Sequence, residues 1–175
     1  MIAEKDIRIR RPGPADATTI AEVHVATWQA AYAGIFPDDF LSAMSVEHRA
    51  EVWTRILEEA TDGPGLHVAV AGGRIVGFAH GGPSRDTDAR DAAEVYAVYV
   101  LPGYWGTGVG RALLDALVAE LTAGAAPEAT LWVLEPNHRA RAFYEREGWK
   151  YDGRAETIER GDTAVQELRY RRSLG

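Results

Sequence analysis

Three alternating glycines separate a continuously apolar stretch from a strongly helical run, and this feature constrains the fold most. The apolar stretch VYAVYV (residues 95–100) is followed by Gly106, Gly108 and Gly110, and the helical run RALLDAL begins at Arg111. Glycine adopts backbone angles that other residues avoid and lets a ligand approach the main chain closely. The N-terminus of a helix adds free N–H groups and a dipole that attract anions. The sequence therefore predicts a strand–loop–helix unit that holds a phosphate-type ligand.

Two common phosphate-binding loops do not fit the residues around these glycines. A P-loop requires a lysine and a serine or threonine after its last glycine, whereas Arg111 and Ala112 stand there. A dinucleotide-binding loop requires the spacing G-x-G-x-x-G and an acidic residue at the end of the second strand, and this chain offers neither. Two interpretations of the glycines remain. They form either a phosphate site of another kind or a glycine-rich connection that binds no ligand.

Length and composition indicate one domain over residues 1–175. The chain has 46% apolar and 26% charged residues, which is ordinary for a globular protein that can bury a core. It contains no cysteine, which excludes disulfides, cysteine zinc sites and a cysteine acyl-enzyme, and we expect no metal. The net charge of −7 weighs against nucleic acid and favours cationic small molecules. Because no apolar run suits a signal peptide or a membrane span, we expect a cytoplasmic protein without a membrane partner.

Periodicity predicts a mixed sheet flanked by helices, in the order β-α-α-β-β-β-α-β-α-β-β. The expected strands are DIRIRR (6–11), LHVAVA and RIVGFAH around a hairpin turn at Gly72-Gly73, EVYAVYVLP (94–102), TLWVL (130–134), and a final hairpin over 149–172 that turns near RGD. The expected helices are one that Asp16 caps, SVEHRAEVWTRILEEA (45–60), the run after the glycines, and NHRARAFYEREG (137–148). DGPG (62–65) is expected to be a loop. The apolar 94–102 segment is predicted to be a central strand buried on both faces.

At this point the chain resembles the GNAT superfamily of acetyl-coenzyme A-dependent N-acyltransferases in two motifs. The first is a buried strand, then Gln/Arg-x-x-Gly-x-Gly/Ala, then a helix, as in VYVLPGYWGTGVGRALL. The second is Asn-x-x-Ala-x-x-Phe-Tyr-x-x-x-Gly-Phe, which NHRARAFYEREGW (137–149) matches with Trp149 in place of phenylalanine. The resemblance covers essentially the whole chain. It implies an α/β fold of mixed α+β type, whose mostly antiparallel sheet has a bulged central strand that splays from its neighbour.

The resemblance also implies acetyl-CoA as co-substrate, with its diphosphate on main-chain amides of the glycine loop. Trp105 stands where the family usually has glutamine or arginine, and Arg111 and Arg141 are the candidate replacements for the missing contact. On the strand, the family pairs the pantetheine arm with backbone groups at Val98 and Val100, and the N–H of Val98 points at the thioester oxygen as an oxyanion hole. The implied coenzyme-binding residues are Val98, Tyr99, Val100, Trp105, Gly106, Thr107, Gly108, Val109, Gly110, Arg111, Asn137, Arg141 and Tyr144.

Two residues of the second motif have a chemical and a plainly structural interpretation. Tyr144 lies one helical turn after Ala140 and therefore on the sheet-facing side of its helix. It is either a core tyrosine or, as the resemblance implies, the group that protonates the coenzyme thiolate. Asn137 either caps its helix or bonds to the pantetheine amide.

The general base has two candidates. Glu94 begins the buried strand, and a carboxylate at the mouth of a partly buried cleft is a suitable base for an ammonium substrate. An exposed strand-end glutamate is the alternative interpretation. His80, at the end of the third strand, is the rival base, and a structural histidine is its plainer interpretation.

The segment HVATWQAAYAGIFPDDF is a candidate acceptor pocket. Trp28 and Tyr32 lie at helical spacing near the end of the first helix, beside the broken AGIFPDD segment. Together with Asp38, Glu94 and His80 they could bind an amine through charge and cation–π attraction, although aromatic residues at this spacing also form cores.

These observations predict an N-acetyltransferase that acts on a primary amine, preferably of a small molecule, by direct transfer in a ternary complex. A coenzyme A-binding sensor of the same fold, and an enzyme that acetylates protein N-termini or lysines, are the alternatives. The edge of the terminal hairpin also suggests a homodimer.

Overall fold

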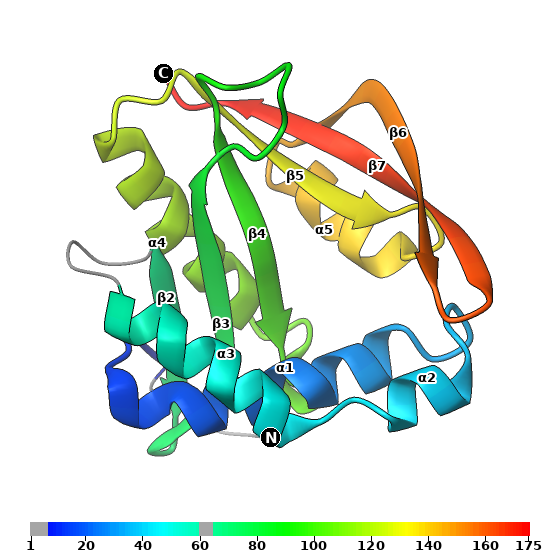
Figure 1. Cartoon of the computed structure of the whole chain (residues 1–175). Coiled ribbons are helices and arrows are strands. Elements are labelled where there is room, and N and C mark those ends of the chain that lie inside the picture. The colour runs from blue at the N-terminus through cyan, green and yellow to red at the C-terminus, as the bar shows by residue number, and fades with distance from the viewer. Residues whose placement is uncertain (1–6, 60–64) are drawn as a thin grey trace.

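The computed structural model describes residues 7–59 and 65–175, and within them one seven-stranded sheet carries helices on both faces (Figure 1). The strands are β1 (Arg8–Arg10), β2 (Leu66–Ala71), β3 (Arg74–Pro83), β4 (Ala93–Val100), β5 (Glu128–Leu134), β6 (Lys150–Arg160) and β7 (Thr163–Ser173). Their order across the sheet is β1-β2-β3-β4-β5-β7-β6, and in this part of the chain only β4 and β5 run parallel. The predicted mixed, mostly antiparallel sheet is confirmed.

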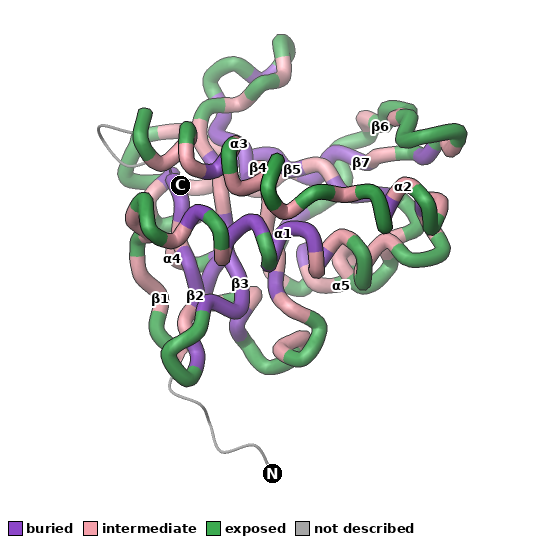
Figure 2. The backbone as a smooth tube through the Cα atoms, turned by 60° about the horizontal axis from the view of Figure 1, so that its bottom comes forward, coloured by how far each residue is buried: buried purple, intermediate pink, exposed green. Residues whose placement is uncertain are grey.

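The helices cover the two faces of the sheet with separate apolar clusters. They are α1 (Ala17–Ala31), α2 (Asp38–Ser42), α3 (Val46–Glu59), α4 (Val109–Ala123) and α5 (His138–Arg146). On one face, α1 and α3 pack against β2 and β3 around Ile20, Trp53 and Phe78. On the other, α4 and α5 contribute Leu113 and Tyr144 to the larger cluster. Figure 2 shows the buried positions concentrated on the central strands and on the inner side of α1.

An extra residue in β4 separates the sheet into two halves. β4 pairs with β3 on both sides of the irregularity, but Ala97 lies opposite His80 and Val95 opposite Gly81, so Tyr96 has no partner in β3. Such a bulge bends the strand and increases its twist. Only residues 93–95 of β4 pair with β5, and beyond them the two strands diverge, as Figure 1 shows. The implied bulged and splayed central strand is therefore present.

A buried arginine holds the second half of the sheet to the loop between β3 and β4. Arg169 on β7 is only 4% exposed, and its guanidinium bonds to three carboxylates. Asp86 and Asp88 come from the loop at 3.1 and 2.8 Å, and Asp152 comes from β6 at 2.7 Å. A buried cation with several hydrogen-bonded partners resists displacement, because leaving it unpaired is costly. This network fixes the position of the β6–β7 hairpin although β4 and β5 have parted.

Several local predictions are confirmed. The β2–β3 hairpin turns at Gly72 and Gly73, which have φ of +57° and +79°. The hydroxyl of Ser45 accepts the N–H of His48 at the start of α3, and Gly148, with φ +85°, follows α5. Residues 1–6, which include the start of the 6–11 segment, and residues 60–64, which include most of the 62–65 loop, lie outside the described residues.

Four predictions need correction. The middle of β4, residues 96–99, is half-buried rather than buried on both faces, because β5 has moved away from it. Asp16 does not cap α1 with its side chain; its carboxylate accepts the Arg10 guanidinium and the N–H of Gly13 instead. The strand β3 continues three residues beyond His80, because its pairing with β4 resumes after the bulge. The predicted element order lacks the short helix α2, which follows the break after α1.

No helix in residues 7–59 or 65–175 has both the length and the apolar character that crossing a bilayer requires. The strand β6 forms one edge of the sheet, and a homodimer through this edge stays a prediction.

Candidate active site

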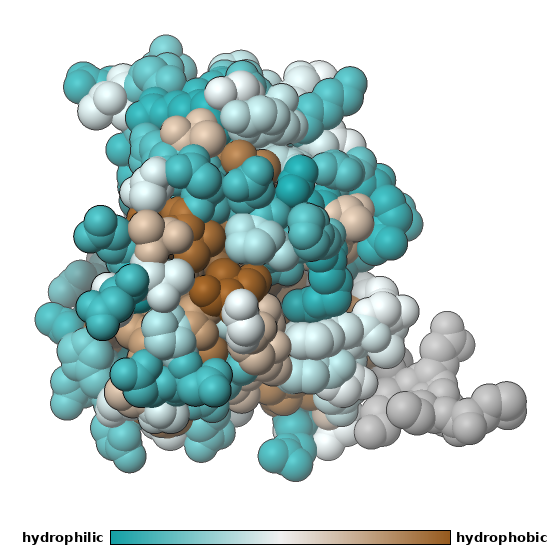
Figure 3. Space-filling view, turned by 90° about the vertical axis from the view of Figure 1, so that its right-hand side faces the viewer, coloured by the Kyte–Doolittle hydropathy of each residue, from teal (hydrophilic) through white to brown (hydrophobic). Residues whose placement is uncertain are grey.

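The divergence of β4 and β5 opens a cleft of about 840 Å³ through the sheet. The glycine loop and α5 line one side of it, which we call the α5 side. Residues of α1, Phe36 and the β6–β7 hairpin line the other, which we call the α1 side. The face that presents the hairpin and α2 has apolar surface near its middle, bordered by hydrophilic side chains (Figure 3).

Most of the sequence-predicted site residues meet in this cleft. Those that line it are Trp28, Tyr32, Glu94, Val98, Tyr99, Val100, Trp105, Gly106, Gly108, Gly110, Arg111, Asn137 and Tyr144. The predicted residues outside its lining are Asp38, His80, Thr107, Val109 and Arg141. The side chain of Val109 is fully buried in the core, and the Thr107 hydroxyl donates to the carbonyl oxygen of Tyr104 at 2.7 Å.

The glycine loop has the backbone that the sequence indicated. Gly106 has φ +74° and Gly108, immediately before α4, has φ +89°. A Cβ at either position would meet no atom within 4 Å, so backbone conformation rather than crowding favours glycine. The N–H groups in the first turn of α4 have no partner within the helix, and Gly108 and Gly110 at this helix start line the cleft. The loop can therefore hold a diphosphate.

Trp105 combines two contacts at the entrance to this loop. Its indole N–H donates to the carbonyl oxygen of Val100 at 2.7 Å, so that oxygen already has one hydrogen-bond donor before any ligand binds. The guanidinium carbon of Arg139 lies 3.4 Å from the centre of the indole ring, which is a cation–π stack. Burial lowers the pKa of Arg139, yet a guanidinium stays charged at any physiological pH. Trp105 thus presents a cation on the α5 side of the cleft.

Neither of the arginines that the sequence suggested takes this place. Arg111 lines the cleft but lies 3.7 Å from a carboxylate oxygen of Asp115 and 3.6 Å from one of Glu147. Arg141 turns away, and its guanidinium donates to the Tyr170 hydroxyl at 3.1 Å and to a backbone carbonyl at 3.0 Å. Arg139, two residues before Arg141 on α5, lines the cleft and stacks on Trp105 instead.

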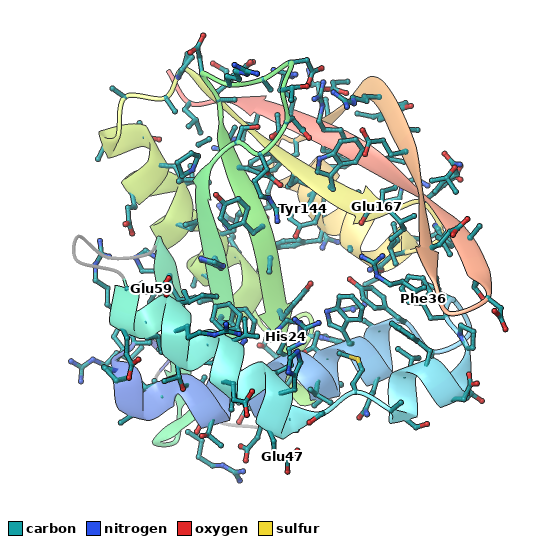
Figure 4. The ribbon with its side chains drawn as sticks, in the orientation of Figure 1. His24, Phe36, Glu47, Glu59, Tyr144 and Glu167 are labelled. Carbon is teal, nitrogen blue, oxygen red and sulfur yellow. The ribbon has the colours of Figure 1, made fainter. Side chains whose placement is uncertain are left out.

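Tyr144 and Asn137 have separate roles at the start and end of α5. Asn137 accepts the N–H of Ala140 at 3.2 Å through its side-chain oxygen, so it caps the helix. Tyr144 is 8% exposed and lines the cleft (Figure 4). Burial, followed by the neighbouring Tyr99, raises the pKa of Tyr144, because a phenolate would lack solvation there. Its hydroxyl is therefore protonated at neutral pH and can donate a proton or a hydrogen bond.

Glu94 is buried and firmly paired. It is 2% exposed, which rules out the exposed strand-end interpretation. Its carboxylate accepts the backbone N–H of Arg85 at 2.8 Å and the Arg85 guanidinium at 2.6 Å. Both oxygens are engaged, so the pair ties the start of β4 to the loop before it. His80 is half-buried outside the lining, with its ring 5.3 Å from that of Trp53 and 5.0 Å from that of Tyr96.

Aromatic rings form the wall on the α1 side. The Trp28 and Tyr32 ring centres are 4.9 Å apart, and those of Tyr32 and Phe36 are 5.6 Å apart, both edge to face. Phe36 also belongs to a small apolar cluster with Leu134 of β5. The aromatic rings therefore belong to an apolar cluster and also form a wall of the cleft. Both interpretations that the sequence offered, core and pocket lining, apply to them. Asp38, in contrast, is exposed at the start of α2.

The sequence analysis did not single out several residues that line the cleft, and Phe36, Arg139 and Glu167 are the ones used below. Phe36 was part of the quoted AGIFPDD segment, and its aromatic character next to Trp28 and Tyr32 was the available signal. Arg139 lies inside the second motif, but nothing in the sequence shows that it stacks on Trp105. Glu167 belongs to no sequence motif. It reaches the cleft through the pairing of β7 with β5.

Comparison with known proteins identifies the family and the fold. The sequence profile described as "Acetyltransferase (GNAT) family" matches residues 25–149. A Bacillus subtilis protein named "Uncharacterized N-acetyltransferase YuaI" is 32% identical over 133 residues, which are 75% of this chain and 73% of that protein.

Solved structures agree in fold. The paiA N-acetyltransferase from Thermoplasma acidophilum in complex with coenzyme A has a TM-score of 0.73 at 21% identity, over 96% of this chain and 99% of that chain. The yncA protein from Salmonella typhimurium with its cofactor acetyl-CoA has a TM-score of 0.72 at 20% identity, over 97% and 94%. The class of protein defined here is an N-acetyltransferase. The chain belongs to the Acetyltransferase (GNAT) family.

Proposed function

We propose that this enzyme transfers the acetyl group of acetyl-CoA to a primary amine of a small molecule by direct attack within a ternary complex. The observation that carries the proposal is one continuous cleft through the sheet. The glycine loop and Arg139 lie on its α5 side, aromatic rings and a carboxylate lie on its α1 side, and Tyr144 lies in its wall. Two substrates that enter from opposite faces would meet beside β4.

The α5 side suits the coenzyme. The N–H groups at the start of α4 and the Arg139 guanidinium can neutralise a diphosphate. Residues 96–100 of β4 lie beyond the last pair with β5, so their edge can pair with the amide groups of pantetheine. Val98 lies on this unpaired segment, where its N–H can polarise the thioester carbonyl. The carbonyl oxygen of Val100 already accepts a hydrogen bond from Trp105. The N–H of Val100 is therefore the stronger candidate for a hydrogen bond to pantetheine.

Tyr144 can act as the general acid when the thiolate of coenzyme A leaves. When the amine nitrogen forms its bond to the acetyl carbon, the carbon–sulfur bond breaks and the electrons pass to sulfur. A neutral phenol beside the sulfur can supply the proton that completes the thiol. Because burial keeps Tyr144 protonated, it is ready for this role at neutral pH.

The closed α1 side favours a small molecule over a protein acceptor. The segment from α1 to α2 crosses the open end between β4 and the hairpin, as Figure 1 shows. There, Phe36 and Leu41 pack against Leu134 of β5 and Val165 of β7. A protein chain would need an open groove at this place, whereas a small amine needs only the existing volume.

The experiment combines purified protein, acetyl-CoA and a panel of primary amines, and it records released thiol. Turnover with at least one small amine supports the proposal. Binding of acetyl-CoA by calorimetry without turnover on any amine would favour a coenzyme sensor. Turnover with lysine-containing peptides alone would favour a protein acetyltransferase.

A further inference from the structure

Glu167 is a carboxylate of the cleft that the catalytic scheme above does not use. It lies on β7, opposite Leu134 of β5 and Glu156 of β6, so all three project from the same face of the sheet. That face is the α1 side, because Leu134 packs against Phe36. Figure 4 shows Glu167 and Tyr144 near the opening between β4 and β5, with Phe36 toward α2.

Glu167 differs from the other carboxylates that line the cleft in having no partner among the residues that the structure describes. Glu94 is bonded to Arg85 at 2.6 Å, Glu147 lies 3.6 Å from Arg111, and Glu156 is bonded to Arg154 at 2.6 Å. Within residues 7–59 and 65–175, the Glu167 carboxylate makes neither a hydrogen bond nor an ion pair. A half-buried carboxylate is costly when it is unpaired, so this position suits a cationic ligand.

The environment of Glu167 favours proton uptake. Burial raises the pKa of its carboxyl, and the nearby Glu156 and Glu94 act in the same direction, whereas Arg160 and Arg85 oppose them. A carboxyl with a raised pKa is a better match for taking a proton from an ammonium than one in open solvent.

Tyrosine hydroxyls face Glu167 from the other walls. Burial is the main cause that raises the pKa of Tyr32, directly after α1, and of Tyr99 on β4, and the charge of Glu167 contributes to both. Both hydroxyls therefore stay neutral, and they leave Glu167 as the negative charge that faces the aromatic wall. A cation bound there would contact a carboxylate and the faces of Trp28 or Tyr32 together.

We propose that Glu167 binds the ammonium group of the acceptor and removes its proton, and that the acceptor is a monoamine on an apolar body. This inference rests on the proposed function. The apolar body fits Phe36, Leu134 and Ile158, which line the same side. Arg160 also lines the cleft, and it would repel a second positive charge, so polyamines are disfavoured.

The proton balance is complete. Glu167 accepts one proton from the ammonium and releases it to solvent after the reaction. The neutral amine forms the nitrogen–carbon bond and the carbon–sulfur bond breaks. Tyr144 gives its proton to the sulfur and recovers a proton from the amide nitrogen. The products are the N-acetyl amine, coenzyme A thiol and one proton.

The test compares wild type, Glu167→Gln and Glu159→Gln with hexylamine, phenethylamine and spermidine as probes. Glu159 is an exposed residue on β6 outside the cleft lining, so its replacement removes the same charge without touching the site. We expect Glu167→Gln to lower kcat/KM for the monoamines by about 10²- to 10⁴-fold, with an unchanged Kd for acetyl-CoA. Glu159→Gln should behave as wild type. Thermal melting of each variant checks folding.

The pH profile separates a base from a merely structural residue. The wild-type kcat/KM should fall at low pH with an ionisation that Glu167→Gln lacks. Glu94→Gln should retain this ionisation, even if the loss of the Arg85 pair lowers its stability. Equal profiles for wild type and Glu167→Gln, loss of the ionisation only in Glu94→Gln, or preference for spermidine would overturn the inference.

Calorimetry distinguishes failure of this inference from failure of the proposed function. Absence of turnover by wild type with every amine contradicts the proposed function. In that case the same amines are titrated into the protein–coenzyme A complex. Binding to wild type that Glu167→Gln loses supports the cation site, whereas equal binding by both, or binding by neither, overturns it.

Discussion

Replacement of Arg139 by alanine tests whether Arg139 supplies the coenzyme contact that glutamine or arginine usually makes at the position of Trp105. The guanidinium of Arg139 stacks on Trp105 at 3.4 Å, and the structure places no carboxylate of the described residues within 4 Å of it. Its charge is therefore available to a phosphate of the coenzyme. We expect Arg139→Ala to weaken coenzyme A binding.

The magnitude follows from the geometry. A hydrogen bond to a charged group contributes about 1.5–3 kcal/mol when it is well shielded. Arg139 is exposed on its outer side, so solvent screening reduces this to about 1–2 kcal/mol. At 25 °C this corresponds to an increase in Kd of about 5- to 30-fold. Arg139→Lys retains the charge but loses the planar stack, so its Kd should lie between those of wild type and Arg139→Ala.

Isothermal calorimetry with coenzyme A and with pantetheine measures this effect. Pantetheine lacks the phosphates, so its affinity should be the same for wild type and Arg139→Ala. The matched control is Arg141→Ala, which removes the same charge from the same helix but on the side that faces Tyr170. An unchanged Kd for coenzyme A in Arg139→Ala, or an equal loss in Arg141→Ala, would refute the reasoning.

Three further predictions address the acid, the loop and the core. Tyr144→Phe should lower kcat by about 10²-fold or more with an unchanged Kd for acetyl-CoA, and a wild-type kcat would show that Tyr144 only packs. Gly108→Ala should destabilise the fold by about 1–2 kcal/mol in urea unfolding because φ is +89°, and it should weaken coenzyme A binding; equal affinity would exclude the loop as the anion site. Burial lowers the pKa of His24 to about 3, so only the unfolded state takes up its proton as the pH falls below about 6.5. The contribution of neutral His24 to the free energy of unfolding is complete above pH 6.5 and decreases by about 1.4 kcal/mol per pH unit toward pH 3. His24→Gln should remove this pH dependence from urea midpoints measured between pH 6.5 and 5.

The sequence contains the local features because local physics decides them. Positive φ requires glycine in the turns and the loop, as at Gly72, Gly106 and Gly108. Apolar spacing determines which side of α4 is buried. The two motifs supplied Tyr144 and the glycine loop as candidate residues, and both line the cleft. The fold class was therefore accessible from the sequence, and so were the glycine loop and Tyr144 as residues that line one cleft.

The tertiary structure decided the features that depend on pairing between distant segments. The bulge at Tyr96 depends on the register between β3 and β4, and it exposes strand residues whose apolar sequence indicated full burial. Glu94 is occupied by Arg85 from the preceding loop, while Glu167 reaches the cleft only through the register of β7 against β5. Periodicity reports which face of an element is apolar, but it holds no information on which distant side chain will lie opposite. For that reason the sequence predicted the glycine loop that we propose for the coenzyme, whereas the residues of the α1 side required the assembled sheet.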